Sequence, residues 1–160
     1  RQLRDHGRNE EGKVTVWGHN ARLDNIQAAI LNEKLQNYQA SINKRRKLAS
    51  LYFQNLKDIS DLILPPPPDE ATKHYDIFQN YEIQSSRRDE LKQFLKNRNI
   101  GTIIQWSGWM LHQFDDLGLK GSAPYAEEMS KRMLLLPMNQ YLSVDEIKHI
   151  CSTIKEFYSQ

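Results

Sequence analysis

The sequence predicts an α+β domain, in which a long N-terminal helix is followed by a small, mostly antiparallel sheet packed with helices. Two observations lead to this fold class. Apolar residues recur at helical spacing over residues 24–58, with no glycine or proline among them. Farther along the chain, short apolar segments with strand character alternate with amphipathic helical patterns, an order typical of one sheet covered by helices.

Length and composition narrow the class of protein. A chain of 160 residues with 39% hydrophobic and 26% charged residues is typical of one soluble globular domain. The mean hydropathy is −0.73, and no apolar run approaches the roughly 20 residues that span a bilayer, so no membrane partner is expected. The net charge of +2, without a broad basic face, argues against nucleic acid. The single cysteine, Cys151, excludes an internal disulfide and favours a reducing, cytoplasmic compartment.

The chain begins with a polar segment and continues into the long helix. Residues 1–22 contain three glycines, and residues 13–17 fit a short extended segment. Asp24, with Gln27 three residues later, has the spacing of a capping box and predicts the helix start. Over residues 24–58 such a helix is roughly 50 Å long at 1.5 Å per residue. Helices of that length typically bridge two domains or lie along a partner.

The next predicted elements are short. An apolar stretch at residues 62–64 fits a brief strand, and the prolines at 65–68 predict an extended polyproline segment. Apolar residues at even spacings then predict a strand over residues 74–85. An amphipathic helix over residues 86–99 follows, with Ser86 as its cap.

The remaining segments complete the sheet and its cover. Residues 100–106 predict a second strand, and residues 112–118 predict a helical turn that ends at a glycine. A helix from Ala123 runs into a short buried strand at residues 134–136, which Pro137 stops.

The chain closes with a helix over residues 143–158. Ser143 is its predicted cap, with Glu146 at the capping-box position. Cys151 lies on the apolar stripe of this helix and is predicted to be a small core residue, because a nucleophilic cysteine needs an activating partner.

Side chains with metal or anion chemistry are sparse. The histidines are scattered, without the close spacing that brings ligands together, so no metal site is predicted. They are His6, His19, His74, His112 and His149. The basic run Lys44–Lys47 lies within the long helix and predicts a solvated face, with an interface or an anionic ligand as the alternative.

Two places in the chain suggest binding sites. Asn20 and Arg22 precede the first helical turn, where free N–H groups and the helix dipole favour an anion, and an amide with a guanidinium suits a phosphate or a carboxylate. The alternative is that Arg22 pairs with a nearby acid and Asn20 makes a turn. Trp106 and Trp109 form either a flat apolar wall for a ring, such as a nucleobase or a sugar, or a plug at the base of the sheet.

Four motifs, in order along the chain, resemble one family. They are "RQLRDHGR" at the start, "GHNARLDNIQAA" at the beginning of the long helix, "IGTIIQW" at 100–106, and "MLLLPMNQYLSVDEIKHI" from Met133. These motifs are similar to those of the DegT/StrS-type nucleotide-sugar aminotransferases, which are PLP-dependent enzymes of the aspartate-aminotransferase fold. The resemblance implies that the chain is the C-terminal half of such a protein. Residues 1–22 would be the segment by which the chain leaves the large domain, which is missing here. Residues 23–160 would form the long connecting helix and the small domain of fold type I.

The resemblance also implies roles for individual residues. Asn20 matches the family asparagine that reaches across a dimer to the PLP phosphate of the other subunit. Arg22 matches an arginine that is expected to hold an anionic group of the donor or the substrate. Gln105, Trp106 and His112 are expected to bind the substrate, with Trp109 as a further part of the same wall.

Two departures from the family pattern leave the substrate open. His19 stands where many members have tyrosine, and Gln105–Trp106 stand where many have histidine–tyrosine. Both positions lie where the family selects its substrate, so the sugar, the nucleotide and the aminated carbon are not predicted. His6 and Gly7 match the family's H-G turn, for which a structural or site-bordering role is expected.

The function that the resemblance implies is transfer of an amino group from glutamate to a keto sugar nucleotide, by a cytoplasmic homodimer that serves polysaccharide or glycan synthesis. The family's Schiff-base lysine precedes the region matched here, so the chain alone is expected to be inactive and to bind no PLP covalently. Two alternatives of the same fold stay open: a non-catalytic dimerising or regulatory module, and a sugar dehydratase with histidine in place of the lysine. The sequence upstream of Arg1 discriminates among the three.

Overall fold

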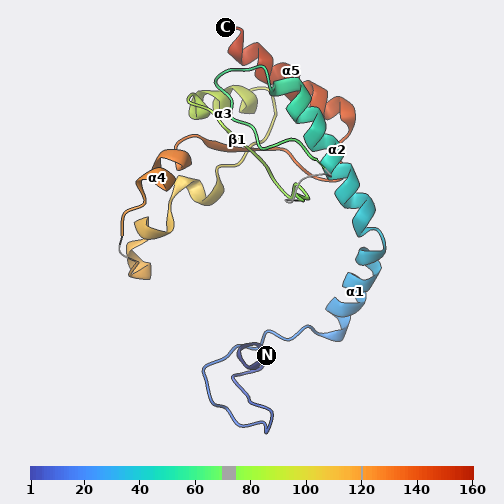
Figure 1. Ribbon diagram of the computed structural model, residues 1–160, viewed down its shortest axis with the longest axis vertical. Helices are drawn as coiled ribbons and strands as arrows, with labels where there is room; N and C mark the ends of the chain where they lie inside the picture. The colour runs from blue at the N-terminus through green and yellow to red at the C-terminus, as the bar shows by residue number, and fades with distance from the viewer. Residues whose placement is uncertain (70–74, 120) are drawn as a thin grey trace. The chain divides into compact units, whose positions relative to one another are not determined.

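A computed structural model describes residues 1–69, 75–119 and 121–160 of the chain (Figure 1). The chain divides into two compact units, Arg1–Gln39 and Ala40–Gln160. The predicted boundary after residue 22 concerns the division of a longer protein and stays a prediction. His74, the first residue of the strand predicted over residues 74–85, lies outside the described residues.

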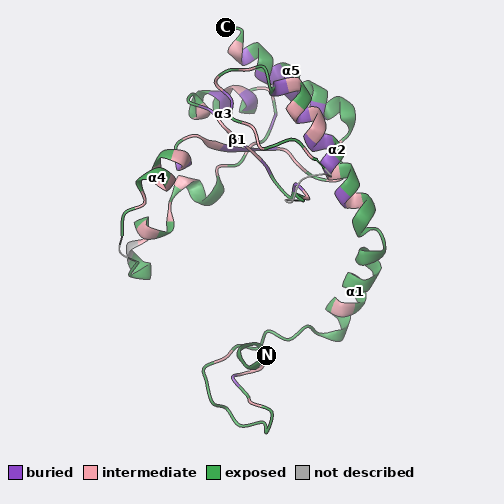
Figure 2. Ribbon diagram, in the orientation of Figure 1, coloured by how far each residue is buried: buried purple, intermediate pink, exposed green. Residues whose placement is uncertain are grey.

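The first unit consists of a looped segment followed by helix α1, Asn25–Gln36. Asp24 caps this helix as predicted, because its carboxylate accepts a hydrogen bond of 2.8 Å from the backbone N–H of Gln27. Every residue of α1 is exposed or half-buried, including the apolar residues of the helical pattern (Figure 2). The periodicity therefore identified a helix here but not a core.

Helix α2, Tyr38–Leu56, begins after a break at Asn37, so the prediction of one continuous helix over residues 24–58 is wrong. Asn37 has φ −105° and ψ 8°, and its N–H bonds to the carbonyl of Lys34, three residues back rather than four. Asparagine is a weak helix former because its side chain competes for backbone hydrogen bonds. The apolar spacing continues across the break, so the pattern alone does not reveal it.

The sheet of the second unit is antiparallel, as predicted. In the described part of the chain, strand β1 (Tyr81–Gln84) pairs with strand β2 (Met133–Leu136). The register places Tyr81 opposite Leu136. Single bridges extend the sheet at both edges, from Ile63 to Gln84 and from Ile103 to Leu135.

The predicted strands differ in accuracy. The strand at residues 134–136 is confirmed by β2. The strand predicted over 74–85 is too long, because within the described residues only 81–84 form a ladder and Phe78 has a left-handed φ of 51°. The strand predicted over 100–106 reduces to the bridge at Ile103, and the chain turns into a 3₁₀ helix from Gln105.

The helices of the second unit follow their predicted positions more closely. They are α3 (Arg88–Lys96), α4 (Pro124–Ser130) and α5 (Val144–Tyr158). Ser143 and Glu146 form the predicted capping box at the start of α5. The predicted cap of α3 is wrong: Arg87 occupies that position, and the hydroxyl of Ser86 instead donates a hydrogen bond to Asp61.

The core of the second unit lies between the sheet and helices α2, α3 and α5 (Figures 1 and 2). Tyr52 of α2 is fully buried and stacks on Tyr81 of β1, with 4.7 Å between ring centroids. Its hydroxyl donates a 2.8 Å hydrogen bond to the carbonyl of Pro137.

Cys151 lies in this core as predicted, and burial raises the pKa of its thiol to about 12. It is therefore a protonated packing residue at neutral pH.

The prediction of a solvated face for the basic run Lys44–Lys47 is wrong for its two arginines. Arg45 donates from Nη1 to the carbonyls of Phe78 and Gln79, at 3.1 and 2.9 Å. Arg46 is buried, donates to the carbonyl of Asp76 at 2.7 Å, and stacks on an aromatic ring. Both side chains lie against the segment that precedes β1. The backbone carbonyls of that segment need hydrogen-bond donors, and the two guanidinium groups supply them. The alternative of an anionic ligand is not supported for groups already engaged in this way.

A polar cluster around Asp61 joins the end of β1 to the C-terminal turn of α5. The Asp61 carboxylate accepts hydrogen bonds from the hydroxyls of Ser85 and Tyr158, each at 2.9 Å, and from the N–H and hydroxyl of Ser86. Burial alone would raise the pKa of the Asp61 carboxyl, but the bonds from Ser86, Ser85 and Tyr158 outweigh it and hold that pKa below its ordinary value.

This cluster predicts acid-sensitive stability. Because the pKa of Asp61 is lower in the folded than in the unfolded chain, its contribution is complete above the ordinary carboxyl pKa of about 3.9 and is lost as the pH falls through the folded value. Asp61→Asn is expected to lower the free energy of unfolding by about 1–2 kcal/mol at pH 7 and by less at pH 3. Urea titrations of both proteins at the two pH values measure this. Equal losses at pH 3 and pH 7 would contradict it.

Candidate functional site

The first candidate site is built by pairing the start of the chain with the segment before α1. The N–H of His6 donates to the carbonyl of His19 at 3.0 Å, and the N–H of His19 donates to the carbonyl of Leu3 at 2.7 Å. An antiparallel bridge then places Asp5 opposite Asn20. The two motifs quoted from residues 1–8 and 18–29 are therefore parts of one structure.

Two glycines allow this close pairing. Gly7 has φ +77°, and a Cβ atom there would lie 1.7 Å from the carbonyl oxygen of Val16. A Cβ at Gly18 would lie 2.1 Å from the backbone nitrogen of Gly7. The H-G turn thus has a structural basis: only a residue without a side chain lets the two segments meet.

Asn20 and Arg22 lie together in the structure. The Nε–H of Arg22 donates to Oδ1 of Asn20 at 3.3 Å, and its Nη1 lies 3.4 Å from Oδ1 of Asp5. The nearby acid that the alternative hypothesis invoked is therefore present. The ion pair of Arg22 with Asp5 has side chains that are 53% and 38% exposed, so it contributes little to stability. It does restrict where the Arg22 guanidinium points.

This arrangement leaves two kinds of hydrogen-bond donor side by side, the amide of Asn20 and the guanidinium of Arg22. Because the oxygen of the Asn20 side chain faces Arg22, the NH₂ of its amide is the part that can donate to a ligand. The helix dipole adds less than the sequence suggested, since Asp24 already supplies a carboxylate to the first turn of α1. An amide NH₂ beside a guanidinium is suited to an anionic group such as a phosphate.

The second candidate site is an aromatic loop, which we define as residues 105–117. It consists of 3₁₀ turns at Gln105–Gly108, Leu111–Gln113 and Asp115–Leu117. The loop surrounds a hollow of about 680 Å³, the aromatic hollow. Its lining residues are Trp106, Trp109, Leu111, Gln113, Phe114, Asp116 and Leu117.

The tryptophans of this hollow are open to solvent. Trp106 is 75% exposed and Trp109 is 53% exposed, so the hypothesis that they plug the base of the sheet is wrong within this chain. Trp106 and Ser107 have φ values of 51° and 55°, a conformation uncommon for residues other than glycine. Gln105 is exposed beside them. The arrangement can present a flat apolar surface with a neighbouring amide, which suits a ring that carries polar substituents.

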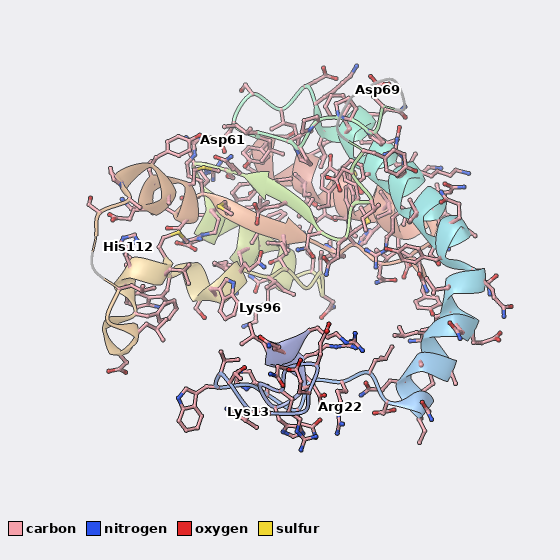
Figure 3. All side chains as sticks on the ribbon, turned by 60° about the horizontal axis from the view of Figure 1, so that its bottom comes forward. Lys13, Arg22, Asp61, Asp69, Lys96 and His112 are labelled. Carbon is pink, nitrogen blue, oxygen red and sulfur yellow. The ribbon has the colours of Figure 1, made fainter. Side chains whose placement is uncertain are left out.

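His112 occupies a different environment from its neighbours. Its Nε2 lies 2.7 Å from Oε1 of Glu127 on α4, and its side chain is only 17% exposed. His112 is labelled in Figure 3. His112 is not among the residues that line the hollow, whereas Leu111 and Gln113 on either side of it are. The structure therefore brings Trp106 and Trp109 together and turns His112 toward α4.

Two residues near these sites had no signal in the sequence. Asp5 reaches Arg22 across 17 residues of chain, and Glu127 reaches His112 across 15. Both contacts arise from how the chain folds back, which spacing rules for a helix or a strand do not report. Among the described residues no group of three or more metal-ligating side chains forms, and none of the described helices has the length and apolar character to span a bilayer.

A model of the DegT/DnrJ/EryC1/StrS aminotransferase family matches residues 1–155. A protein of Geobacillus stearothermophilus named pleiotropic regulatory protein is 36% identical over 162 residues, which cover 99% of this chain and 43% of the relative. A dTDP-3-amino-3,4,6-trideoxy-alpha-D-glucose transaminase of Micromonospora megalomicea subsp. nigra is 34% identical, over 98% of this chain and 43% of the relative.

Among solved structures, an aminotransferase of this family from Brucella abortus superimposes with a TM-score of 0.82 at 31% identity. The match covers 99% of this chain and 42% of that one. The chain thus spans less than half the length of the relatives that it matches. The predicted α+β fold class with a small antiparallel sheet is confirmed, and this solved structure of the same fold is an aminotransferase of the matching family.

Proposed function

Because the chain belongs to the DegT/DnrJ/EryC1/StrS aminotransferase family, we propose that the whole protein moves an amino group from glutamate to a keto group on a nucleotide-linked sugar. The observation that carries the proposal is the family match over residues 1–155, supported by a relative named as a dTDP-amino-sugar transaminase. The glutamate donor, the homodimer and the cytoplasmic location belong to the proposal.

The family is PLP-dependent, and the first candidate site fits a phosphate. The Asn20 and Arg22 side chains are exposed, and the Nε–H of Arg22 donates to Oδ1 of Asn20 at 3.3 Å, which leaves the NH₂ of Asn20 as a donor beside the guanidinium. We assign Asn20 to the cofactor phosphate of a second subunit and Arg22 to an anionic group of the donor or substrate. When bound, PLP supplies the electron sink that amino-group transfer needs. The lysine that holds it is expected in the part of the protein outside this chain.

The second candidate site provides the proposed substrate wall. Trp106 presents an exposed ring for stacking on a flat or hydrophobic face of the substrate, and Trp109 extends the same surface. Gln105 is exposed beside Trp106 and offers an amide to a sugar hydroxyl. His112 belongs to the same loop, and its proposed part in binding depends on its contact with Glu127.

One experiment on two proteins tests this function. The whole protein and the 160-residue chain are each incubated with PLP and reduced with borohydride, and the whole protein is then assayed with glutamate and dTDP- and UDP-linked keto sugars. The whole protein is expected to carry one pyridoxyl group on a lysine outside this chain and to form an amino sugar. The chain alone is expected to carry none. A stoichiometric adduct on one lysine of the chain alone would contradict the proposal.

A second candidate function rests on the relative named as a pleiotropic regulatory protein. A regulatory or dimerising module would keep this fold without transferring an amino group. In that case the lysine upstream is replaced and the whole protein forms no amino sugar. Histidine at the lysine position, with loss of water from the sugar, would instead indicate the dehydratase.

A further inference from the structure

The aromatic loop is joined to α4 by one short side-chain contact. The Nε2 of His112 lies 2.7 Å from Oε1 of Glu127, and both side chains are at least partly buried. An ionised carboxylate can only accept a hydrogen bond, so Nε2–H of His112 is the donor. The contact therefore fixes both the ring position and the nitrogen that carries the proton.

We propose that Glu127 is a positioning residue, which holds the aromatic loop through His112 in the conformation that presents Trp106 and Trp109 to the nucleotide sugar. The inference rests on the proposed function and extends it to a residue outside the aromatic hollow. It also assigns His112 an anchoring role within the substrate-binding loop.

Two features of the loop make such an anchor necessary. Its regular structure is limited to 3₁₀ turns, whose hydrogen bonds have poorer geometry than those of an α-helix. Trp106 and Ser107 also hold left-handed backbone conformations, which persist only where surrounding contacts enforce them. A charge-assisted bond to a neighbouring helix supplies that restraint.

The positions of the side chains next to His112 also indicate that its contact with Glu127 restrains the aromatic loop. Leu111 and Gln113 line the hollow, whereas His112 between them is turned away to Glu127. The side-chain amide of Gln113 is itself engaged, since its oxygen accepts a 2.8 Å bond from the N–H of Met110. Releasing His112 would therefore free the middle of the segment that carries the lining residues.

The helix offers a matched control for testing Glu127. Glu128 is the next residue of α4, is exposed, and pairs with Lys131 one turn away rather than with the loop. In the whole protein, Glu127→Ala is expected to raise the KM for the nucleotide sugar about tenfold, the effect of losing one charge-assisted bond. Glu128→Ala is expected to leave it within about twofold. Glu127→Gln keeps an acceptor oxygen for His112 and is expected to restore most of the affinity.

Two further readouts separate positioning from a general loss of structure. Formation of the aminated cofactor from glutamate does not use the sugar, so its rate is expected to be unchanged in Glu127→Ala. Hydrogen exchange of residues 105–117 is expected to rise in Glu127→Ala and not in Glu128→Ala. Equal behaviour of the two alanine variants, a parallel loss of the glutamate step, or failure of Glu127→Gln to restore binding would overturn the inference. A wild-type protein that forms no amino sugar would refute the proposed function instead, and the exchange measurement would still decide the anchor.

Discussion

Replacing Asn20 with alanine in the whole protein is expected to weaken PLP binding about 10- to 100-fold. The proposed bond from the Asn20 amide goes to a charged phosphate, and hydrogen bonds to charged groups contribute about 1.5–3 kcal/mol. The substitution also removes the oxygen that accepts the 3.3 Å bond from Arg22. Titration of the cofactor-free protein with PLP, followed by absorbance, measures the dissociation constant.

A second substitution at the same position separates these two effects. Asn20→Asp keeps an oxygen for Arg22 but replaces the donor with a negative charge, so it is expected to bind PLP more weakly than Asn20→Ala. Asn32 is an exposed asparagine on α1, and Asn32→Ala is expected to bind like the wild type. If Asn20→Ala and Asn32→Ala bind PLP equally well, Asn20 has no part in the phosphate site.

Tyr52→Ala is expected to lower the free energy of unfolding of the second unit by about 3–5 kcal/mol. The ring is fully buried against Tyr81, and its loss leaves a cavity between α2 and the sheet. Tyr52→Phe keeps the stacking and loses the 2.8 Å bond to the Pro137 carbonyl, so it is expected to cost about 0.5–1.5 kcal/mol. Urea denaturation followed by circular dichroism measures both.

The control for this prediction is an exposed tyrosine. Tyr141 is 83% exposed, and Tyr141→Ala is expected to change the free energy of unfolding by less than about 0.5 kcal/mol. Similar losses in Tyr52→Ala and Tyr141→Ala would show that the stack between α2 and β1 does not dominate the core.

The fold was most predictable where a signal is local. Asp24 and Ser143 mark helix starts because a cap needs only the side chain and the N–H groups two or three residues ahead. The stripe of α5 placed Cys151 in the core for a similar reason, since a helix converts spacing along the chain into a face. The break at Asn37 was missed because apolar spacing continues across it.

Strand length was less predictable, because a strand ends where its partner ends. Residues 75–80 and 104–106 have strand-like patterns, yet pairing in the described sheet is limited to the short ladder of β1 with β2 and single bridges. The engagement of Arg45 and Arg46 was missed for a related reason: their acceptors lie about 30 residues away in the chain.

The sequence by itself determined the fold class, the caps of α1 and α5, the family and the residue types at both candidate sites, because caps, periodicity and motifs depend on neighbours along the chain. Only the tertiary structure decided that Asp5 meets Arg22, that Glu127 meets His112, and that the aromatic hollow opens to solvent. Those contacts join segments that no local spacing relates, and they form only when the chain folds back on itself and burial selects one partner for each polar group.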